Sequence, residues 1–173
     1  MGCLAGPVVA AAVILSPKDI PKGIDDSKKL SATKRELLDV EIRARAVCFS
    51  IACATVEEID TINIFHAARL AMMRAVHALN PCAHHLLIDG NHALRTGISQ
   101  TCIVKGDAIS VSIGAASILA KVYRDKLMRE MDHSYPGYRF ADHKGYGSVV
   151  HRQALQNLGP TPLHRKSFSW TPV

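Results

Sequence analysis

Two aspartates follow apolar runs in the middle of the chain. Asp89 ends the run 86–88 and precedes a glycine, and Asp107 stands just after the run 103–104 and before a helix-like segment. Carboxylates at strand ends in an α/β fold lie at one rim of the sheet, where two of them can share a hard divalent cation. Each aspartate alone is more typical of a turn or of a helix entry, so the pair by itself indicates only a candidate metal site.

Strand and helix patterns on both sides of these aspartates predict a mixed fold. Short β-branched runs predict strands, and apolar positions with helical periodicity predict helices. Strands followed by alternating strands and helices predict an α/β fold whose sheet has antiparallel and parallel parts. The predicted strands are 8–15, 47–54, 85–88 and 101–104. The first predicted helix is 31–46, with Ser31 as its cap, and the capping box Thr55–Glu58 predicts a short turn that is followed by a longer helix ending at Asn80-Pro81. Helices over 110–131 and from Ser148 to Gly159 follow, with 135–147 as a loop between them.

Length and composition are typical of one globular domain, residues 1–173. A chain of 173 residues with 48% hydrophobic content can bury a large core. The apolar stretch 8–15 lacks a basic leader and is too short to span a bilayer, so we expect no membrane association and a cytoplasmic location. The five cysteines show no C-x-x-C spacing, which favours free thiols and argues against a structural zinc site.

Basic residues gather in the last third of the chain. Residues 121–173 contain nine Lys and Arg against four Asp and Glu, whereas residues 1–120 contain twelve against eleven. This asymmetry favours a polyanion-binding face, although a solvated basic surface gives the same count. No glycine-rich phosphate loop follows a predicted strand, which argues against a small-molecule α/β enzyme.

Several motifs in fixed order together resemble one family. They are Asp26-Ser27-Lys28-Lys29-Leu30-Ser31, Asn63-Ile64 with Ala71-Met72, Ile88-Asp89-Gly90-Asn91, Lys105-Gly106-Asp107, the stretch Ala115 to Val122 with Arg124-Asp125, His143-Lys144-Gly145-Tyr146-Gly147, and the tail His164 to Phe168. Their order and spacing are similar to those of ribonuclease HII, the bacterial type 2 ribonuclease H, over essentially the whole chain. Ordered motifs of this kind are more specific than any single one.

The resemblance implies an activity and a set of site residues. It implies an endoribonuclease that cleaves the RNA strand of RNA–DNA hybrids and nicks duplex DNA 5′ of embedded ribonucleotides, with two Mn²⁺ or Mg²⁺ ions as cofactors. It also implies a monomer whose partners are these nucleic acids. Asp89 and Asp107 match the third and fourth carboxylates of the family's metal site. The residues expected to bind nucleic acid are Gly2, Lys28, Lys29, Lys121, Lys144, Tyr146 and Arg165.

Two of these residues carry the expected recognition of RNA, which requires a reading of the 2′-hydroxyl. In the family a Gly-Arg-Gly turn reads this group with its backbone, helped by a tyrosine that stacks on the neighbouring sugar. Gly2 matches the end of that turn and Tyr146 matches the tyrosine. The lysines and Arg165 are expected phosphate contacts.

The resemblance also implies a fold, and one departure from it. The expected fold is a ribonuclease H-like mixed sheet flanked by helices, with a helical C-terminal extension. In the family the first strand is central, carries an Asp-Glu pair and leads into the Gly-Arg-Gly turn, of which only the end is present here, with Met1 where the arginine would stand. We therefore expect the central first strand, and half of the metal site, to be missing, through a start codon assigned too far downstream or because the chain is a fragment.

Three alternatives remain open from the residues alone. Asp125 is either a fifth carboxylate of the site or, as we favour, an ion-pair partner of Lys121 one helical turn before it. Tyr146 among glycines is either a stacking residue or a packing residue of the C-terminal extension. The whole chain is either part of an active nuclease or a catalytically dead remnant that still binds nucleic acid.

Overall fold

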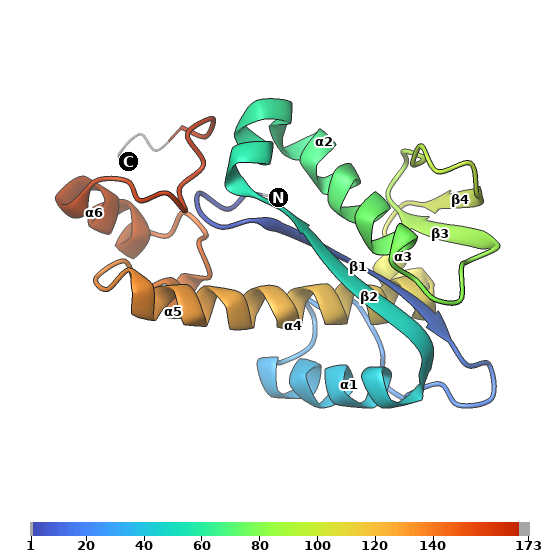
Figure 1. Cartoon of the computed structure of the whole chain (residues 1–173). Helices are drawn as coiled ribbons and strands as arrows, with labels where there is room; N and C mark the ends of the chain where they lie inside the picture. The colour runs from blue at the N-terminus through green and yellow to red at the C-terminus, as the bar shows by residue number, and fades with distance from the viewer. Residues whose placement is uncertain (1, 170–173) are drawn as a thin grey trace.

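The computed structural model describes residues 2–169 and arranges them as two small sheets with helices on both sides (Figure 1). The first sheet is antiparallel and pairs β1 (Val8–Leu15) with β2 (Ala46–Ala54), and the second is parallel and pairs β3 (His85–Asp89) with β4 (Ser99–Ile103). The predicted antiparallel and parallel parts are therefore both present. Met1, which we placed at the arginine of the turn, lies outside the described residues.

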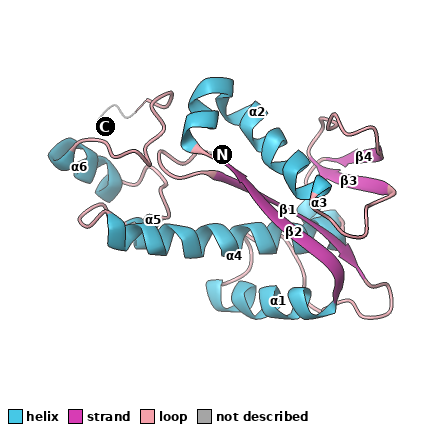
Figure 2. Ribbon diagram, viewed as in Figure 1, coloured by secondary structure: helices cyan, strands magenta, loops and turns pink. Residues whose placement is uncertain are grey.

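Helices cover the first sheet from two sides (Figure 2). The long helix α2 packs on one face of β1 and β2, and α4 packs on the other, with α1 against α4. The C-terminal helices form a small lobe at one end of α4. The helices are α1 (Ala32–Arg45), α2 (Val56–His77), α3 (Gly106–Ile109), α4 (Val111–Ser134), α5 (Phe140–His143) and α6 (Val149–Leu158).

The predicted helix caps are confirmed. The Ser31 hydroxyl accepts a hydrogen bond from the Lys34 N–H at 3.2 Å, and the Ser148 side chain caps α6 in the same way. Thr55 and Glu58 form the predicted capping box, in which each side chain bonds the other residue's backbone N–H. Such caps satisfy N–H groups that a helix start leaves unpaired, which is why local sequence alone identifies them.

The short turn predicted at the capping box and the longer helix predicted after it are both present, and a kink separates them. The α2 helix is kinked at Asn63, whose φ of 63° is left-handed and whose side chain accepts from the N–H groups of Phe65 and His66. An Asn side chain tolerates this conformation because it can replace the lost backbone bonds. The expected loop 135–147 contains the short helix α5.

The two sheets do not join into one mixed sheet. Among the described residues, β1 pairs only with β2, and β3 pairs only with β4. Between them lies a cavity of about 460 Å³, lined by residues 9–15 of β1, residues 85–89 of β3 and parts of α2 and α4. The edges of β1 and β3 that face this cavity therefore have no strand partner.

Small residues bring α4 close to the rest of the fold. A Cβ on Gly114 would lie 2.9 Å from the Ile24 side chain and 3.1 Å from the carbonyl oxygen of Asp107. Ala115 and Ile118 on the same helix are completely buried. The Ala- and Gly-rich face of α4 therefore lies in direct contact with the loop before α1 and with α3, the short helix that contains Asp107.

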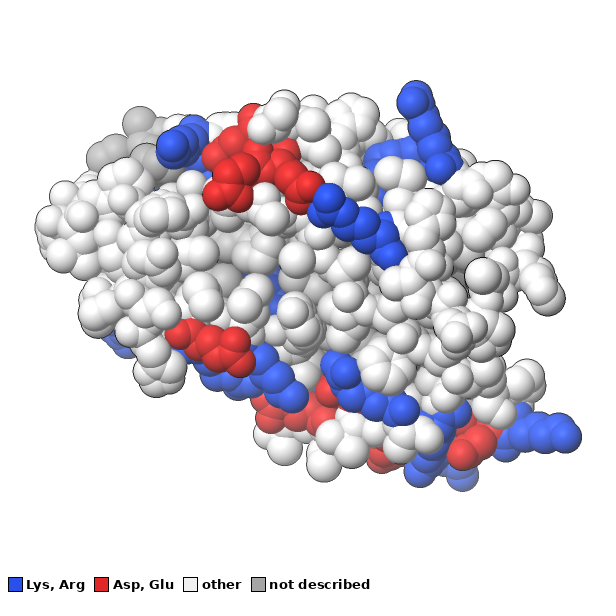
Figure 3. Space-filling model, viewed as in Figure 1, with Lys and Arg blue, Asp and Glu red and all other residues white. Residues whose placement is uncertain are grey.

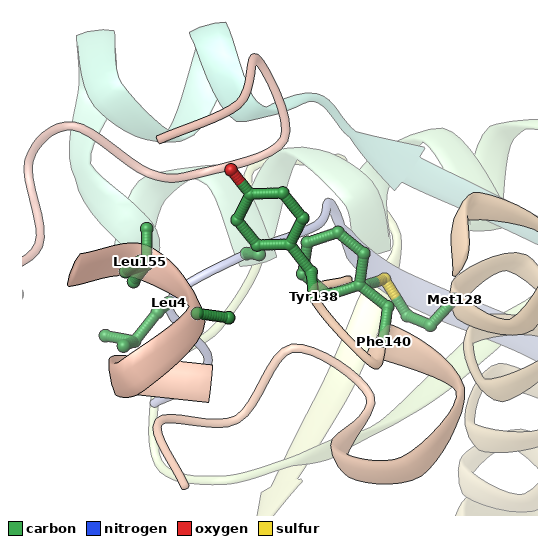
Figure 4. Packing of buried hydrophobic residues seen from close by; sticks show 7 residues of the cluster. Leu4, Met128, Tyr138, Phe140 and Leu155 are labelled. Atoms are coloured by element: carbon green, nitrogen blue, oxygen red, sulfur yellow. The ribbon is translucent and has the colours of Figure 1, made fainter. Parts of the chain in front are cut away.

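The C-terminal lobe has its own apolar core (Figure 4). The rings of Tyr138 and Phe140 stack at 5.4 Å, beside Met128 of α4 and Leu155 of α6. Leu4 from the N-terminal segment also belongs to this core, and its N–H donates to the Gly145 carbonyl at 2.8 Å. The first residues of the chain are thus tied to the lobe rather than to the sheets.

Neither membrane helices nor disulfides occur in the part of the chain that the structure describes. No helix within residues 2–169 is long and apolar enough to cross a bilayer. All five cysteines have free thiols, as predicted, with Cys3 buried and Cys82 exposed.

The contact between Gly145 and the N-terminal segment leads to a stability prediction. Gly145 has a φ of +80°, and a Cβ there would lie 2.5 Å from the Ala5 carbonyl oxygen. Gly97 has a φ of +68° with no heavy atom within 4 Å of its Cβ position. Gly97→Ala should lower the free energy of unfolding by about 1 kcal/mol through backbone strain, and Gly145→Ala by about 2–4 kcal/mol because the clash is added. Urea unfolding measures both, and equal losses would contradict the docking of this segment.

Candidate active site and nucleic-acid interface

A hydrogen bond between the Asp89 side chain and the Gly106 backbone places one predicted carboxylate beside the residue before the other. Asp89 is the last residue of β3, and its Oδ1 accepts from the Gly106 N–H at 2.9 Å. Asp107 follows directly in α3. A Cβ on Gly106 would lie 2.5 Å from the end of the Ile113 side chain and 3.4 Å from Asp89 Oδ1, so the backbone at Gly106 packs closely on both residues. The strand ends that the sequence predicted to share a rim do so.

The environments of the two carboxylates differ. The Asp89 residue is exposed, whereas Asp107 is only 9% exposed. The exposed Lys28 ammonium lies 3.5 Å from Asp107 Oδ2.

The two carboxylates supply only some of the ligands that a metal site needs. Asp89 and Asp107 supply the carboxylate oxygens that Mg²⁺ and Mn²⁺ prefer. Within residues 2–169, however, no group of three or more His, Cys, Asp or Glu side chains is arranged to hold a metal. The two aspartates are thus compatible with a divalent cation but do not complete its coordination.

A second group of predicted residues lies further along α4. Cys3, next to Gly2, forms an antiparallel bridge with Tyr146, so the two residues expected to recognise RNA lie near each other. The Tyr146 side chain is 47% exposed. The charged ends of Lys121 and Arg124 both lie 5.9 Å from its ring centroid. Partial burial and the adjacent Cys3 thiol raise the pKa of Tyr146, so it carries its hydroxyl proton at neutral pH.

Lys121 lines a charged groove between α1, α4 and the loop 144–148, which contains Tyr146 and is called the Tyr146 loop below. Asp125 accepts from Lys121 Nζ at 2.7 Å and lies 3.8 Å from the Arg35 guanidinium, which confirms its predicted ion pair with Lys121. The groove has a volume of about 470 Å³. Its charged lining residues are Arg35, Glu36, Lys121, Asp125, Arg129, Asp142 and Lys144.

The remaining predicted phosphate contacts occupy different environments. Burial lowers the pKa of Lys144, whose ammonium donates to the Ala141 carbonyl at the edge of the groove. Lys29 is exposed and lies 3.5 Å from Asp25. Arg165 does not match the prediction of a phosphate contact, because it is only 1% exposed and its Nε donates to the Gly6 carbonyl at 3.0 Å. Burial lowers its pKa to about 10.

Arg124 is a residue that the sequence reasoning gave no role. Its guanidinium donates to the carbonyls of Ala5 at 3.0 Å, Pro7 at 3.3 Å and Lys144 at 2.8 Å. Arg124 therefore joins α4 to both the N-terminal segment and the Tyr146 loop. Arg124 lies three residues after Lys121 and so on the same helix face, which was the available signal. The carbonyl partners of Arg124 are distant in sequence, so the sequence alone does not predict its contacts.

Charge on the face shown in Figure 3 is mixed rather than uniformly basic. Blue and red side chains alternate along the lower edge, over α1 and α4, and an acidic group lies at the top over the start of α2. The surface between them is largely uncharged. The excess of basic residues in the C-terminal third therefore does not form a single patch on this face.

Comparison with known proteins identifies the family. The family model described as Ribonuclease HII matches residues 1–171. The chain belongs to the ribonuclease HII family. It is 54% identical over 169 residues to the ribonuclease HII of Anaeromyxobacter sp. (strain Fw109-5), which covers 97% of this chain and 53% of that protein. It is 51% identical over 172 residues to the ribonuclease HII of Caulobacter vibrioides (strain NA1000 / CB15N), which covers 99% of this chain and 81% of that protein. The chain thus spans about half the length of the first ribonuclease HII and about four fifths of the second.

Solved structures confirm the ribonuclease HII-like α/β fold. The structure of the PCNA:RNase HII complex from Archaeoglobus fulgidus superposes with a TM-score of 0.81 at 22% identity, over 97% of this chain and 90% of that one. Bst-RNase HIII in complex with Mn²⁺ superposes with a TM-score of 0.70 at 17% identity, over 98% of this chain and 64% of that one. At these identities the similarity supports the fold alone.

The role of Arg124 can be tested against a second arginine. Arg124→Lys in this ribonuclease HII chain should lower the free energy of unfolding by about 2–4 kcal/mol, because an ammonium cannot reach three divergent carbonyls. Arg139, which is exposed and paired with Asp142 at 2.7 Å, is the control, and Arg139→Lys should change stability by less than about 0.5 kcal/mol. Chemical denaturation measures the free energy of unfolding of both variants. A similar small change in both would show that Arg124 does not join the N-terminal segment to the Tyr146 loop.

Proposed function

We propose that this chain forms the body of a ribonuclease HII that hydrolyses the RNA strand of RNA–DNA hybrids and nicks duplex DNA on the 5′ side of embedded ribonucleotides. The products are a 3′-hydroxyl and a 5′-phosphate. Family membership supports the nuclease activity, and the single observation that carries the assignment of the site is the Asp89–Gly106 hydrogen bond. That bond holds the Asp89 carboxylate next to Gly106, the residue before Asp107.

Asp89 and Asp107 are the proposed metal ligands. Two Mn²⁺ or Mg²⁺ ions would activate the attacking water and neutralise charge on the scissile phosphate and the leaving oxygen. The chain itself orients the carboxylates, since Asp89 is fixed by the Gly106 N–H and Asp107 is enclosed where α3 and α4 meet. Lys28 balances the charge of Asp107 until a cation takes its place.

Tyr146 and Gly2 are the proposed readers of the ribonucleotide. The half-exposed Tyr146 ring offers an apolar face for a sugar, and its protonated hydroxyl offers a donor. Gly2 lies beside it in the chain segment that bridges to Tyr146, and a Cβ on Gly2 would have no heavy atom within 4 Å. An unobstructed backbone is what a close contact with a 2′-hydroxyl requires. The neighbouring groove, with Lys121 and Lys144, is the proposed path of the phosphate backbone.

The rest of the metal site belongs, in this proposal, to a further strand between β1 and β3. The unpaired edges of both strands and the 460 Å³ cavity between them support it, because an edge inside a fold is normally paired or covered. By family resemblance this strand carries an Asp-Glu pair. A strand in that cavity would run beside β3, and its end would bring further carboxylates toward Asp89.

A second function remains a candidate. A nucleic-acid-binding protein without catalysis is favoured by one observation, namely that the described residues provide only two of the carboxylates that a metal site needs. The groove and Tyr146 would still bind a hybrid in that case. Cleavage assays distinguish the two functions, because this alternative predicts binding without turnover.

Asp89→Asn and Asp107→Asn, each in a protein extended upstream by the proposed strand, should lower kcat at least about a hundredfold. The loss of a ligand removes several kcal/mol of transition-state stabilisation, while an Asn at position 89 can still accept from Gly106. Affinity for the hybrid should change little. Cleavage of a duplex with one ribonucleotide measures the rate. Asp19→Asn, an exposed aspartate in the loop after β1, is the control. Full activity of Asp89→Asn at saturating metal would remove Asp89 from the site.

Tyr146→Ala should reduce cleavage of a duplex with one ribonucleotide more than cleavage of a long RNA–DNA hybrid. A hybrid offers many registers, whereas a single ribonucleotide must be positioned by the stacking contact itself. Tyr123 on α4 is 42% exposed, close to the 47% of Tyr146, so Tyr123→Ala is the matched control. Equal loss on both substrates, together with a lower melting temperature, would favour a packing role for Tyr146.

The chain of 173 residues should be inactive and poorly soluble on its own, whereas the same chain with an upstream strand that carries an Asp-Glu pair should be soluble and active. The physical reason is that two unpaired strand edges and an apolar cavity favour association between molecules. Both versions are expressed side by side and assayed on one duplex with a single ribonucleotide. Comparable activity of the shorter version would show that the proposed strand is unnecessary.

A further inference from the structure

Three histidines surround the Tyr146 loop in the C-terminal lobe. His151 of α6 is completely buried and His164 of the tail is 1% exposed. The rings of His143 and His151 stack at 4.3 Å, and the Nε2 atoms of His151 and His164 lie 3.0 Å apart. Phe140 packs edge-on against both His143 and His151. Family membership and the proposed metal site do not account for this cluster.

The hydrogen bonds assign the proton positions of the two buried rings. The Thr161 N–H donates to His164 Nδ1 at 2.9 Å, so this nitrogen carries no proton and the neutral ring has its proton on Nε2. His164 Nε2–H must then donate to His151 Nε2. His151 in turn carries its proton on Nδ1 and donates it to the Tyr146 carbonyl at 2.8 Å. The chain of bonds therefore has one direction, from Thr161 to Tyr146.

His143 forms a further hydrogen bond to the same loop. Its Nδ1 accepts from the Gly145 N–H at 3.2 Å, and its Nε2 donates to the Tyr138 carbonyl at 2.8 Å. The stacked pair thus holds the N–H of Gly145 with one ring and the carbonyl of Tyr146 with the other. Because every ring nitrogen already has a hydrogen-bond partner, the three histidines are not arranged as metal ligands.

We propose that His151 is a positioning residue for Tyr146, and that the neutral pair His143–His151 holds the Gly145–Tyr146 backbone so that the Tyr146 ring meets the sugar of the substrate. This inference rests on the proposed reading role of Tyr146. The Ser148 N–H also donates to the Tyr146 carbonyl at 2.8 Å, and His151 adds a side-chain donor to the same oxygen from the lobe core. The Cys3 bridge then fixes the opposite side of Tyr146.

The arrangement requires neutral rings. A second proton on His151 would point at the Nε2–H of His164, and burial lowers the pKa of His151 from 6.5 to about 4. Burial also lowers the pKa values of His143 and His164. The charged groups that face the cluster are Arg152 near His151, and Asp132, Arg139 and Asp142 near His143. Since the folded pKa of His151 is depressed, its contribution to stability is complete above pH 6.5 and is lost as pH falls toward 4.

The first test reads the tautomers directly and needs no variant. Long-range ¹⁵N NMR of the extended protein near neutral pH should show His151 as the Nδ1–H tautomer and His143 and His164 as Nε2–H tautomers. The Nδ1–H form is the distinctive expectation, because the hydrogen bond to Tyr146 depends on it. An Nε2–H or doubly protonated His151 near neutral pH would overturn the proposal, whatever the protein does to nucleic acid.

The second test asks whether His151 acts through Tyr146. The extended protein carries fluorotyrosine, and Tyr146→Phe assigns the Tyr146 resonance among the four tyrosines. His151→Phe keeps an aromatic ring but removes both hydrogen bonds, so it should shift or broaden the Tyr146 resonance. His151→Asn, whose amide can still donate to the Tyr146 carbonyl, should restore much of the signal. Leu155→Ala in the same helix and core is the control, and an equal change there would overturn the proposal.

Binding gives the functional arm of the same test. His151→Phe should weaken the preference for a duplex with one ribonucleotide over an all-DNA duplex by at least about fivefold, the low end of one aromatic stacking contact. In a Tyr146→Ala background the same change should have no further effect. An undiminished effect in that background would show that His151 acts elsewhere. If the unmodified protein has no preference for the ribonucleotide, the proposed function fails, while the two NMR measurements still decide the role of His151.

Discussion

The close packing of α4 against β1 and the loops beside it fixes the relative position of every candidate functional residue. Its small face touches Ile24 and the carbonyl of Asp107, which holds the carboxylate end of the site at the start of the helix. Further along, Lys121 faces the Tyr146 ring. Arg124 joins the helix to the N-terminal segment and to the loop of Tyr146. The one continuous helix α4 therefore contacts both the proposed cleavage site and the proposed recognition site.

The cavity between β1 and β3 is the second feature on which the proposed site depends. Backbone groups of a sheet edge need partners, and apolar side chains around an empty space lose contacts that a neighbouring strand would supply. The cavity is lined on one side by the apolar strand β1 and on the other by β3, which ends at Asp89. The proposed strand would both complete the core and supply carboxylates to the metal site, so folding and catalysis in our proposal depend on one strand.

Local signals in the sequence predicted much of the fold, and family motifs supplied the residues of the candidate site. Ser31 and Thr55 were identifiable as caps because their partners lie three residues away. The burial of Arg165 was not predictable, since it depends on Gly6, more than a hundred residues away in the chain. The separation into two sheets likewise depends on which strands are available to pair. His151 carries no local signal, because its role follows from tertiary contacts with His164 and the Tyr146 loop.

The central claim is that Asp89 and Asp107 bind a divalent cation at the rim of the fold. Paramagnetic broadening of amide NMR signals by substoichiometric Mn²⁺ in the extended protein tests it most directly. The account predicts the strongest broadening at Gly90, Gly106 and Ala108, and its loss in the Asp89→Asn/Asp107→Asn double variant. The acidic start of α2, with Glu57, Glu58 and Asp60, is an internal comparison, because it offers negative charge without strand-end geometry. Broadening centred on that turn, or unchanged in the double variant, would contradict the account.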